Sequence, residues 1–143
     1  KNMANVIPYA FRGELFTGTH NFASGGDSFK IALYTSSATL NATTTAYSTT
    51  NEVSGTGYTA GGTTLSSQSV TLDTTNGVAF FDAADPSFTS ATITARGALI
   101  YNNSKSNAAI AVLDFGSDFS SSNGTFQVQF PTAAHNTALI RIS

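Results

Sequence analysis

Residues 92–115, TITARGALIYNNSKSNAAIAVLDF, decide which fold this chain of 143 residues can adopt. Two apolar runs, 92–102 and 108–115, stand on either side of a polar turn at 103–107. Each run is rich in β-branched and aliphatic side chains and is apolar on both faces, which is typical of central strands covered from both sides. We therefore expect two neighbouring central strands joined by this turn.

Further strands are predicted on both sides of this pair. Residues 29–34 alternate and predict a half-buried strand with Phe29, Ile31 and Leu33 on one face. Residues 68–73 and 78–82 flank the turn signal 74–77 and predict a hairpin that buries Val70 and Leu72 on its first strand and places Val78 and Phe80 on one face of its second. Alternating patterns recur at 125–130 and 138–143. About seven to nine short strands predict an all-β fold, a single-domain antiparallel β-sandwich or barrel-like structure.

The N-terminal part of the chain carries the only pattern with helical spacing. Within residues 6–22, Phe11, Leu15 and Phe16 recur at intervals that place them on one helix face, and Pro8 suits the start of a helix. This short helix either packs over one end of a sheet or serves as a docking arm, and we favour packing. The predicted domain is 1–143, with 1–27 as the N-terminal segment and 28–143 as the β-sandwich.

Residues 36–53 consist almost entirely of small polar residues and alanine, and they predict a long surface loop. Loops of this length inside a compact domain usually carry function or are ordered by a partner.

Composition and charge argue against several classes of partner. The net charge is -2, charged residues make up 10% of the chain, and the six basic residues form no stripe that could neutralise a row of phosphates. No apolar run approaches the roughly 20 residues that cross a bilayer, and no signal-peptide pattern is visible at the N-terminus. We therefore expect a protein that binds neither nucleic acid nor membrane and is not exported by that route. The chain has no cysteine, so it has no disulfide and no thiolate chemistry.

The stretch 52–62, EVSGTGYTAGG, raises the question of a phosphate-binding loop. A dinucleotide fingerprint needs Gly-x-Gly-x-x-Gly before a helix, whereas here the spacing differs and a β-branched, polar run follows. We interpret the stretch as a glycine-rich turn and expect no cofactor.

Catalytic and metal-binding patterns are also missing. His20 and His135 lie in polar stretches without metal-ligand spacing, so we interpret both as surface histidines. No Gly-x-Ser-x-Gly elbow is present, and the DFG triplet at 114–116 stands in a chain far too short for a kinase. The pairs Asp82 with Asp85 and Asp114 with Asp118 offer too few oxygens for calcium. We expect no enzyme activity and no bound metal.

Four blocks of the sequence together resemble a widespread family of small virion proteins of tailed bacteriophages. The blocks occur in the same order as in that family and cover nearly the whole chain: FKIALYTSSATLN (29–41), TNEVSGTGYTAGGTTL (50–65), FFDAADPSFTSATITARGALIYN (80–102) and LDFGSDFSSSNGTFQVQFP (113–131). The opening PYAFRGELFTGTHNF is similar to the short N-terminal helix of the family. The chain departs from the family pattern in the Thr-rich 36–50 loop and in the last residues, FPTAAHNTALIRIS.

The resemblance implies a capsid decoration or cement protein on the phage head, made in the bacterial host cytoplasm, which binds the major capsid protein at junctions between subunits and stabilises the head. It also implies a homo-oligomer, for which we predict a trimer. Two alternatives stay open. One is a tail or fibre component, distinguished by its place in the particle. The other is a receptor- or glycan-binding module of the virion, which would show a concave face with clustered aromatic and amide side chains.

Two segments carry the contact residues that we predict. The N-terminal segment contributes Tyr9, Phe11, Arg12 and Phe16, and the glycine-rich loop contributes Ser54, Gly55, Thr56, Gly57 and Tyr58. Tyr58 is interpreted either as an exposed interface anchor or as a residue that folds back over the sheet edge. We expect Arg96 to have a structural role, paired with Asp82 or Asp114.

Overall fold

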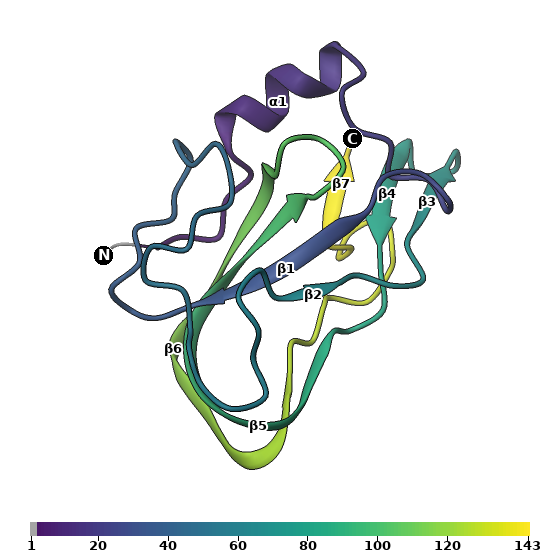
Figure 1. The fold of residues 1–143 in the computed structure, drawn as a ribbon. Helices are drawn as coiled ribbons and strands as arrows, with labels where there is room; N and C mark the ends of the chain where they lie inside the picture. Colours follow the sequence, from purple (N-terminus) through teal and green to yellow (C-terminus); the bar gives the residue numbers. More distant parts are fainter. Residues whose placement is uncertain (1–2) are drawn as a thin grey trace.

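The computed structural model describes residues 3–143, which form two antiparallel sheets and one short helix (Figure 1). The elements in chain order are α1 (Tyr9–Phe16), β1 (Phe29–Tyr34), β2 (Thr63–Thr64), β3 (Ser69–Asp73), β4 (Val78–Asp82), β5 (Ser87–Asn102), β6 (Ala108–Gln127) and β7 (Ile140–Ile142). The larger sheet has the order β2-β1-β5-β6 and the smaller one β3-β4-β7. The all-β prediction with one short N-terminal helix is confirmed, and within residues 3–143 the two sheets do not close into a barrel.

The central pair predicted from residues 92–115 is the longest hairpin of the protein. β5 pairs with β6 in a register that places Leu99 opposite Val112 and Ile100 opposite Ala111, and all four side chains are buried. The turn at 103–107 is confirmed, and Asn107 has a φ of 57° there, a left-handed conformation that asparagine tolerates.

Both faces of the larger sheet are covered. On one face Ile31, Leu33 and Ile100 share a cluster with Phe81 of the smaller sheet and Phe11 of the helix. On the other face a second cluster is closed by Ala38 and Leu40 from the loop between β1 and β2, over Ala32, Tyr34, Leu99 and Tyr101. The expectation of a half-buried β1 is therefore wrong, because the 36–53 loop lies over the face that was expected to meet solvent.

β5 and β6 extend further than the sequence predicts. The segment 125–127 is the end of the 20-residue β6, where Phe126 pairs with Phe88, so the expected separate strand at 125–130 is wrong. Val128 and Phe130 are buried as expected, but they follow the strand. In the middle the register jumps from Ala95↔Phe119 to Gly97↔Asp114, so that β6 carries a wide bulge at 115–118.

The smaller sheet contradicts one predicted burial. Val70 and Leu72 of β3 are 53% and 69% exposed, although Val70 pairs with the buried Phe81 on the same side of the sheet. β3 is an edge strand, and the core ends before it. In β4 the buried residues are Val78 and Phe81, whereas Phe80 is only partly buried. A hairpin pattern predicts the pairing of two strands, but it does not say whether a further layer covers them.

The helix packs against the sheets, as favoured above. It starts directly after Pro8 and ends at Phe16, and Gly18 beyond it has a φ of 65°. Phe11 is buried against His20 and Phe22, whereas Phe16 is 96% exposed. The expectation that Phe11 and Phe16 share a buried face is therefore wrong.

Candidate functional site

The glycine-rich loop 52–62 lies against the larger sheet with its backbone in direct contact. A Cβ atom on Gly62 would stand 1.7 Å from the Ile31 carbonyl oxygen, and one on Gly57 would stand 2.6 Å from the Cα atom of Ala91. Both glycines have positive φ values, 78° and 83°. The interpretation as a glycine-rich turn is confirmed, because these positions need both left-handed backbone and the absence of a side chain.

Tyr58 is tied into the sheet by its hydroxyl group. The Leu33 N–H donates to the Tyr58 hydroxyl oxygen at 2.9 Å, and that hydroxyl donates to the Glu52 carboxylate. Burial, followed by the hydrogen bond to Glu52, raises the pKa of Tyr58. The interpretation of Tyr58 as an exposed anchor is therefore wrong, and the alternative, a residue folded back over the sheet, is the observed one.

The Glu52 carboxylate accepts hydrogen bonds from three residues of this region. Besides Tyr58, the Tyr47 hydroxyl donates to its carboxylate at 2.7 Å and the Gly61 N–H at 2.8 Å. The Tyr101 hydroxyl of β5 donates to the Gly61 carbonyl at 2.6 Å. This glutamate holds the 36–62 region against β1 and β5. Ser54, Gly55, Thr56 and Gly57 are exposed at the outer edge of the loop, and their role as contact residues stays a prediction.

The His20 side chain is buried, contrary to its interpretation as a surface histidine, whereas the His135 side chain is 41% exposed, as expected. The side-chain amide nitrogen of Asn102 donates to His20 Nδ1 at 2.8 Å and to Asp27 at 2.8 Å. Asn102 Oδ1 accepts from the Ser104 N–H, which fixes the orientation of this amide. His20 Nδ1 is therefore an acceptor, and Nε2 carries the proton that is donated to Glu14 at 2.9 Å.

These bonds join α1 and the segment that follows it to the end of β5, which is far from both in the sequence. Glu14 belongs to α1, His20 and Asp27 to the segment before β1, and Asn102 to the end of β5. Every polar atom of the His20 ring and of the Asn102 amide has a partner within the protein, so we assign the cluster a structural role in holding α1 on the sheet.

Arg96 bridges two carboxylates across the β6 bulge. Its Nε atom lies 3.6 Å from Asp114 Oδ1 and its Nη1 atom 3.7 Å from Asp118 Oδ1. The expected structural pairing of Arg96 with Asp114 is confirmed, with Asp118 as a second partner. The DFG triplet at 114–116 is the start of this bulge, where the Asp114 side chain accepts from the Gly116 N–H.

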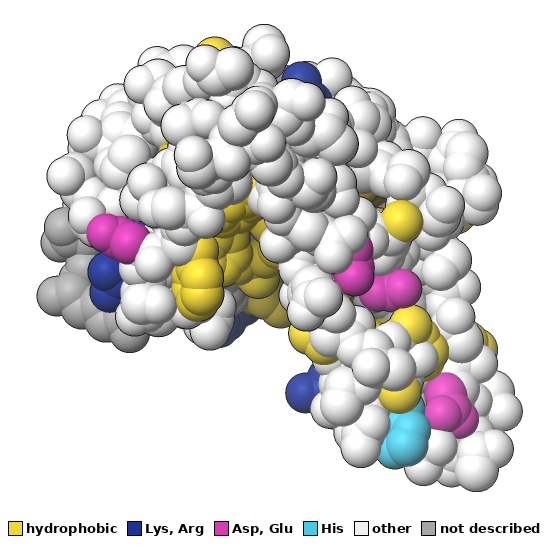
Figure 2. All heavy atoms as spheres, turned by 90° about the horizontal axis from the view of Figure 1, so that it is seen from below, with side chains coloured by type: hydrophobic (Ala, Val, Ile, Leu, Met, Phe, Trp, Pro, Cys, Tyr) yellow, Lys and Arg dark blue, Asp and Glu magenta, His cyan; other side chains and the backbone are white. Residues whose placement is uncertain are grey.

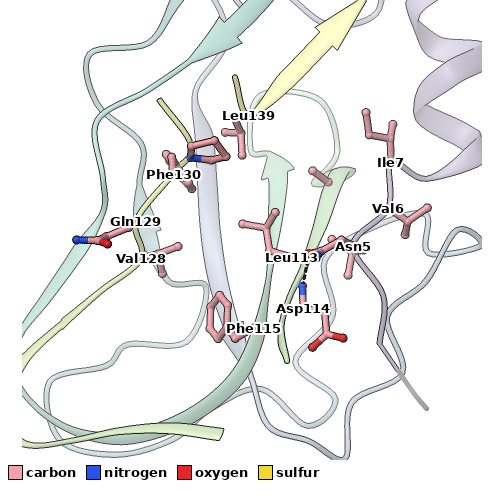
Figure 3. Close-up of a pocket in the computed structure, with 13 residues that line it drawn as sticks. Asn5, Val6, Ile7, Leu113, Asp114, Phe115, Val128, Gln129, Phe130 and Leu139 are labelled. Atoms are coloured by element: carbon pink, nitrogen blue, oxygen red, sulfur yellow. Dashed lines mark hydrogen bonds between the residues drawn. The ribbon is translucent and has the colours of Figure 1, made fainter. Parts of the chain in front are cut away.

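A groove opens beside the bulge, between β6 and the segment that follows it. We call it the bulge groove and define it by the apolar and amide side chains that line it: Leu113, Phe115, Phe119, Val128, Gln129 and Phe130. The part that is bounded by Asn5, Val6 and Ile7 of the N-terminal segment (Figure 3) has a volume of about 480 Å³, and the part beside Phe119 has a volume of about 510 Å³. Seen from below, the molecule has a recess lined with hydrophobic side chains (Figure 2).

A second exposed apolar surface lies on the smaller sheet. We call it the outer face and define it by Val70, Leu72 and Ile142, which continue the core-facing side of Phe81 and Ile140 beyond the edge of the core. Leu72 pairs with Ala79, and Ala79 pairs with Ile142, so the side chains of Leu72, Ala79 and Ile142 stand in one row across β3, β4 and β7. An apolar row on solvent-exposed strands is typical of a surface that binds another protein.

The third exposed surface is one side of α1. Tyr9, Arg12 and Phe16 follow one another at helical spacing, and all three are exposed. The Arg12 guanidinium lies 5.2 Å from the centre of the Tyr9 ring. Three of the four contact residues predicted in this segment thus share one exposed helix face, which we call the helix face. The fourth, Phe11, is 1% exposed on the opposite side, so its prediction as a contact residue is wrong.

Within residues 3–143, no three acidic, histidine or cysteine residues gather as metal ligands, and no helix is long and apolar enough to cross a membrane. Comparison of the chain with protein-family models, with curated proteins and with solved structures found no match in any of the three.

Proposed function

We propose that this protein is a structural component of a tailed-bacteriophage virion, a decoration protein that binds the major capsid protein on the head surface and stabilises the head. The proposal joins the resemblance of the four sequence blocks to one observation, the outer face. Val70, Leu72 and Ile142 lie on one side of a small sheet, and each of these apolar side chains is more than half exposed.

The energetics of the outer face suit attachment to a large partner. Apolar surface that is removed from water on docking contributes about 25 cal/mol per Å². A standard interface covers about 800 Å² on each partner, and the outer face supplies its apolar centre. A protein that binds only assembled subunits adds its binding free energy to the assembly, in proportion to the sites that it occupies. This is how a decoration protein stabilises a head without any chemistry of its own.

The nature of the bulge groove favours a protein partner over a sugar. Its aromatic rings all come from phenylalanine. Its polar side chains are Asn5 and Asp114 in one part, Ser120, Thr125 and Gln127 in the other, and Gln129 in both. The Asn5 amide oxygen already accepts from the Asp114 N–H at 2.7 Å, and Gln127 already donates to Ser87. Hydroxyl-rich ligands need more free hydrogen-bonding groups than these, whereas apolar side chains of a protein need none.

The proposal is tested on virions of the phage that encodes the protein. Gentle stripping of these virions should release the protein from the head surface. Depleted heads should rupture at lower temperature than intact ones, and adding the protein back should restore the rupture temperature. The variant Leu72→Ser/Ile142→Ser should restore it poorly, and the matched variant Thr71→Ser, at an exposed neighbouring position on the same strand, should act as wild type.

Three results would contradict the proposal. Release of the protein with tails would favour a tail or fibre component. Binding of an oligosaccharide by the isolated protein would favour the glycan-binding alternative. An unchanged rupture temperature after removal of the protein would exclude a stabilising role on the head.

A further inference from the structure

We propose that a hollow between α1 and β7 binds an acidic segment of the partner, one that presents a carboxylate beside apolar side chains. We call it the arginine hollow and define it by the two cations and the aliphatic side chains that line it: Arg12, Arg141, Ile7, Leu15, Ile140 and Ile142. The inference rests on the proposed function for the identity of the partner, the major capsid protein, and it adds the chemistry that this partner must present.

Three segments of the chain form the hollow. Arg12 and Leu15 come from α1, Arg141 comes from β7, and Ile7 comes from the segment that leads into the helix (Figure 1). β7 is an edge strand of the smaller sheet, and within residues 3–143 no further strand closes this side. With a volume of about 420 Å³, the hollow is large enough to receive side chains of a partner segment.

The positive charge of the hollow is not neutralised by the part of the chain that the structure describes. Arg96 and Lys105 each form an ion pair with aspartate side chains. Within residues 3–143, Arg12 and Arg141 have no carboxylate at ion-pair distance, and no acidic side chain lines the hollow. The whole chain has a net charge of -2, so the hollow is a local positive site on a weakly negative molecule.

Each guanidinium keeps most of its donors free. Arg12 Nη2 donates to the Ile7 carbonyl oxygen over a long distance of 3.4 Å. Arg141 Nη1 donates to the His135 carbonyl oxygen, also at 3.4 Å. The other contact of Arg12 is with the face of the Tyr9 ring, which attracts the cation without using an N–H group. A guanidinium carries five N–H donors in a planar fork that matches a carboxylate, which is therefore a group that both arginines are free to bind.

The aliphatic side chains decide which kind of anion fits. Leu15 is 39% exposed and Ile142 is 55% exposed, so the hollow has apolar surface that a ligand can cover. A free phosphate or a nucleic-acid backbone would leave that surface in water, and two cations are too few to neutralise a row of phosphates. A protein segment with an aspartate or glutamate next to an apolar residue covers the surface and pairs with the arginines at once.

The arginine hollow is continuous with the outer face. Ile142 belongs to both surfaces, and Leu15 lines the hollow as well as a small apolar pocket of about 100 Å³ beside Val70. A partner that covers the outer face therefore also reaches Arg12 and Arg141. Charged groups that complement a partner fix the register of an interface and suppress wrong partners. The outer face thus supplies the apolar centre of the contact, and the arginine hollow fixes its orientation.

Binding of the purified protein to depleted heads tests the inference, measured as the protein concentration that half-saturates the heads. At low salt, Arg12→Gln and Arg141→Gln should each raise this concentration about tenfold, because each removes charge-assisted hydrogen bonds. The matched control Lys105→Gln removes the same charge from a lysine outside the hollow, and it should bind within about twofold of the wild type. Raising the salt from about 0.05 M to about 0.5 M should shrink the difference between the arginine variants and the wild type. Circular dichroism should show the same fold for all four proteins.

Cross-linking locates the carboxylate of the partner. On heads that carry the Arg141→Lys variant, a water-soluble carbodiimide should join the introduced lysine amine to an aspartate or glutamate of the major capsid protein. The amide bond forms with loss of water, which converts the carbodiimide to its urea. Lys105, whose side chain is 44% exposed, is the internal control and should give no such link when the digested heads are analysed by mass spectrometry.

Four results would overturn the inference. Arginine variants that bind depleted heads as the wild type does, or a Lys105→Gln variant that weakens binding as much, would do so and leave the proposed function standing. Self-association of the free protein that is lost in Arg12→Gln and Arg141→Gln would assign the hollow to a second copy instead. Failure of the wild type to bind depleted heads at all would overturn the proposed function and, with it, this choice of partner.

Discussion

The larger sheet and the smaller sheet differ in how completely they are covered. The larger sheet has a buried cluster on each face, one towards α1 and the smaller sheet, and one closed by the loop between β1 and β2. The smaller sheet leaves Val70, Leu72 and Ile142 in solvent, whereas the larger sheet leaves apolar surface open in the bulge groove beside its edge strand β6. The comparison suggests that loops and polar clusters around the larger sheet maintain the structure, while the uncovered apolar surfaces are available for partners.

The largest effect on stability is expected at Gly62. Gly62→Ala places a methyl group against the Ile31 carbonyl at a backbone φ of 78°, so we expect a loss of about 3 kcal/mol or more, measured by denaturant unfolding. Gly13→Ala is the matched control. It stands in α1 with nothing within 4 Å of the new methyl group, and it should stabilise the protein by about 0.5–1 kcal/mol. Equal changes in unfolding free energy for Gly62→Ala and Gly13→Ala would contradict the close packing of the glycine-rich loop against the sheet.

The next effect concerns the hydroxyl group of Tyr58. Tyr58→Phe leaves the Leu33 N–H without its acceptor and Glu52 without one donor, which should cost about 1–3 kcal/mol of unfolding free energy. Tyr9→Phe alters an exposed tyrosine and should change stability by less than about 0.5 kcal/mol. A neutral Tyr58→Phe would show that the loop is not held by this cluster.

The lowered pKa of Asp27 leads to a prediction of how the stability of the protein depends on pH. Desolvation acts to raise the pKa of Asp27, but hydrogen bonds from the Asn21 N–H, Asn102 and Lys105 outweigh it and hold the pKa below its ordinary value of 3.8. A carboxyl group with a lowered pKa stabilises the folded state above its unfolded pKa, and this contribution is lost as the pH falls through the folded value.

Asp27→Asn should therefore be less stable than the wild type at pH 7, by about 1 kcal/mol, since it removes charge-assisted hydrogen bonds at a site near the surface. The difference should shrink below about pH 4, as the wild-type carboxyl becomes protonated. Denaturant unfolding at a series of pH values measures it, and a difference that stays constant down to pH 2 would contradict the assignment.

The smallest effect on stability is expected at the outer face. Leu72 is 69% exposed, so Leu72→Ser should change the unfolding free energy by about 0.5 kcal/mol or less. The same substitution should weaken attachment to heads, measured as the amount of protein that remains bound after washing. A large loss of stability would show that Leu72 belongs to the core and would move the docking surface elsewhere.

The sequence predicts the parts of this fold that depend on local pattern. The strands predicted at 92–102, 108–115 and 29–34 and the turn at 103–107 all appear as expected. Burial of whole faces is not a local property. The exposure of Val70 and Leu72, and the covering of β1 by the 36–53 loop, depend on which distant segment packs on a strand.

The same limit applies to the candidate sites. His20 and Asn102 are 82 positions apart in the sequence, and no sequence pattern predicts that their side chains are hydrogen-bonded. Tyr58 is ambiguous in the sequence because a tyrosine among glycines suits both an anchor and a tether, and only the positions of Leu33 and Glu52 decide between them. The bulge groove arises from a register jump in β6 that its alternation does not reveal.

Hydrogen exchange on the protein bound to depleted heads, compared with the free protein, tests the central claim most directly. The account predicts slower exchange on binding in β3 and β7, around the outer face, with little change in the glycine-rich loop at 54–58. Slower exchange confined to that loop, with β3 and β7 unchanged, would contradict it.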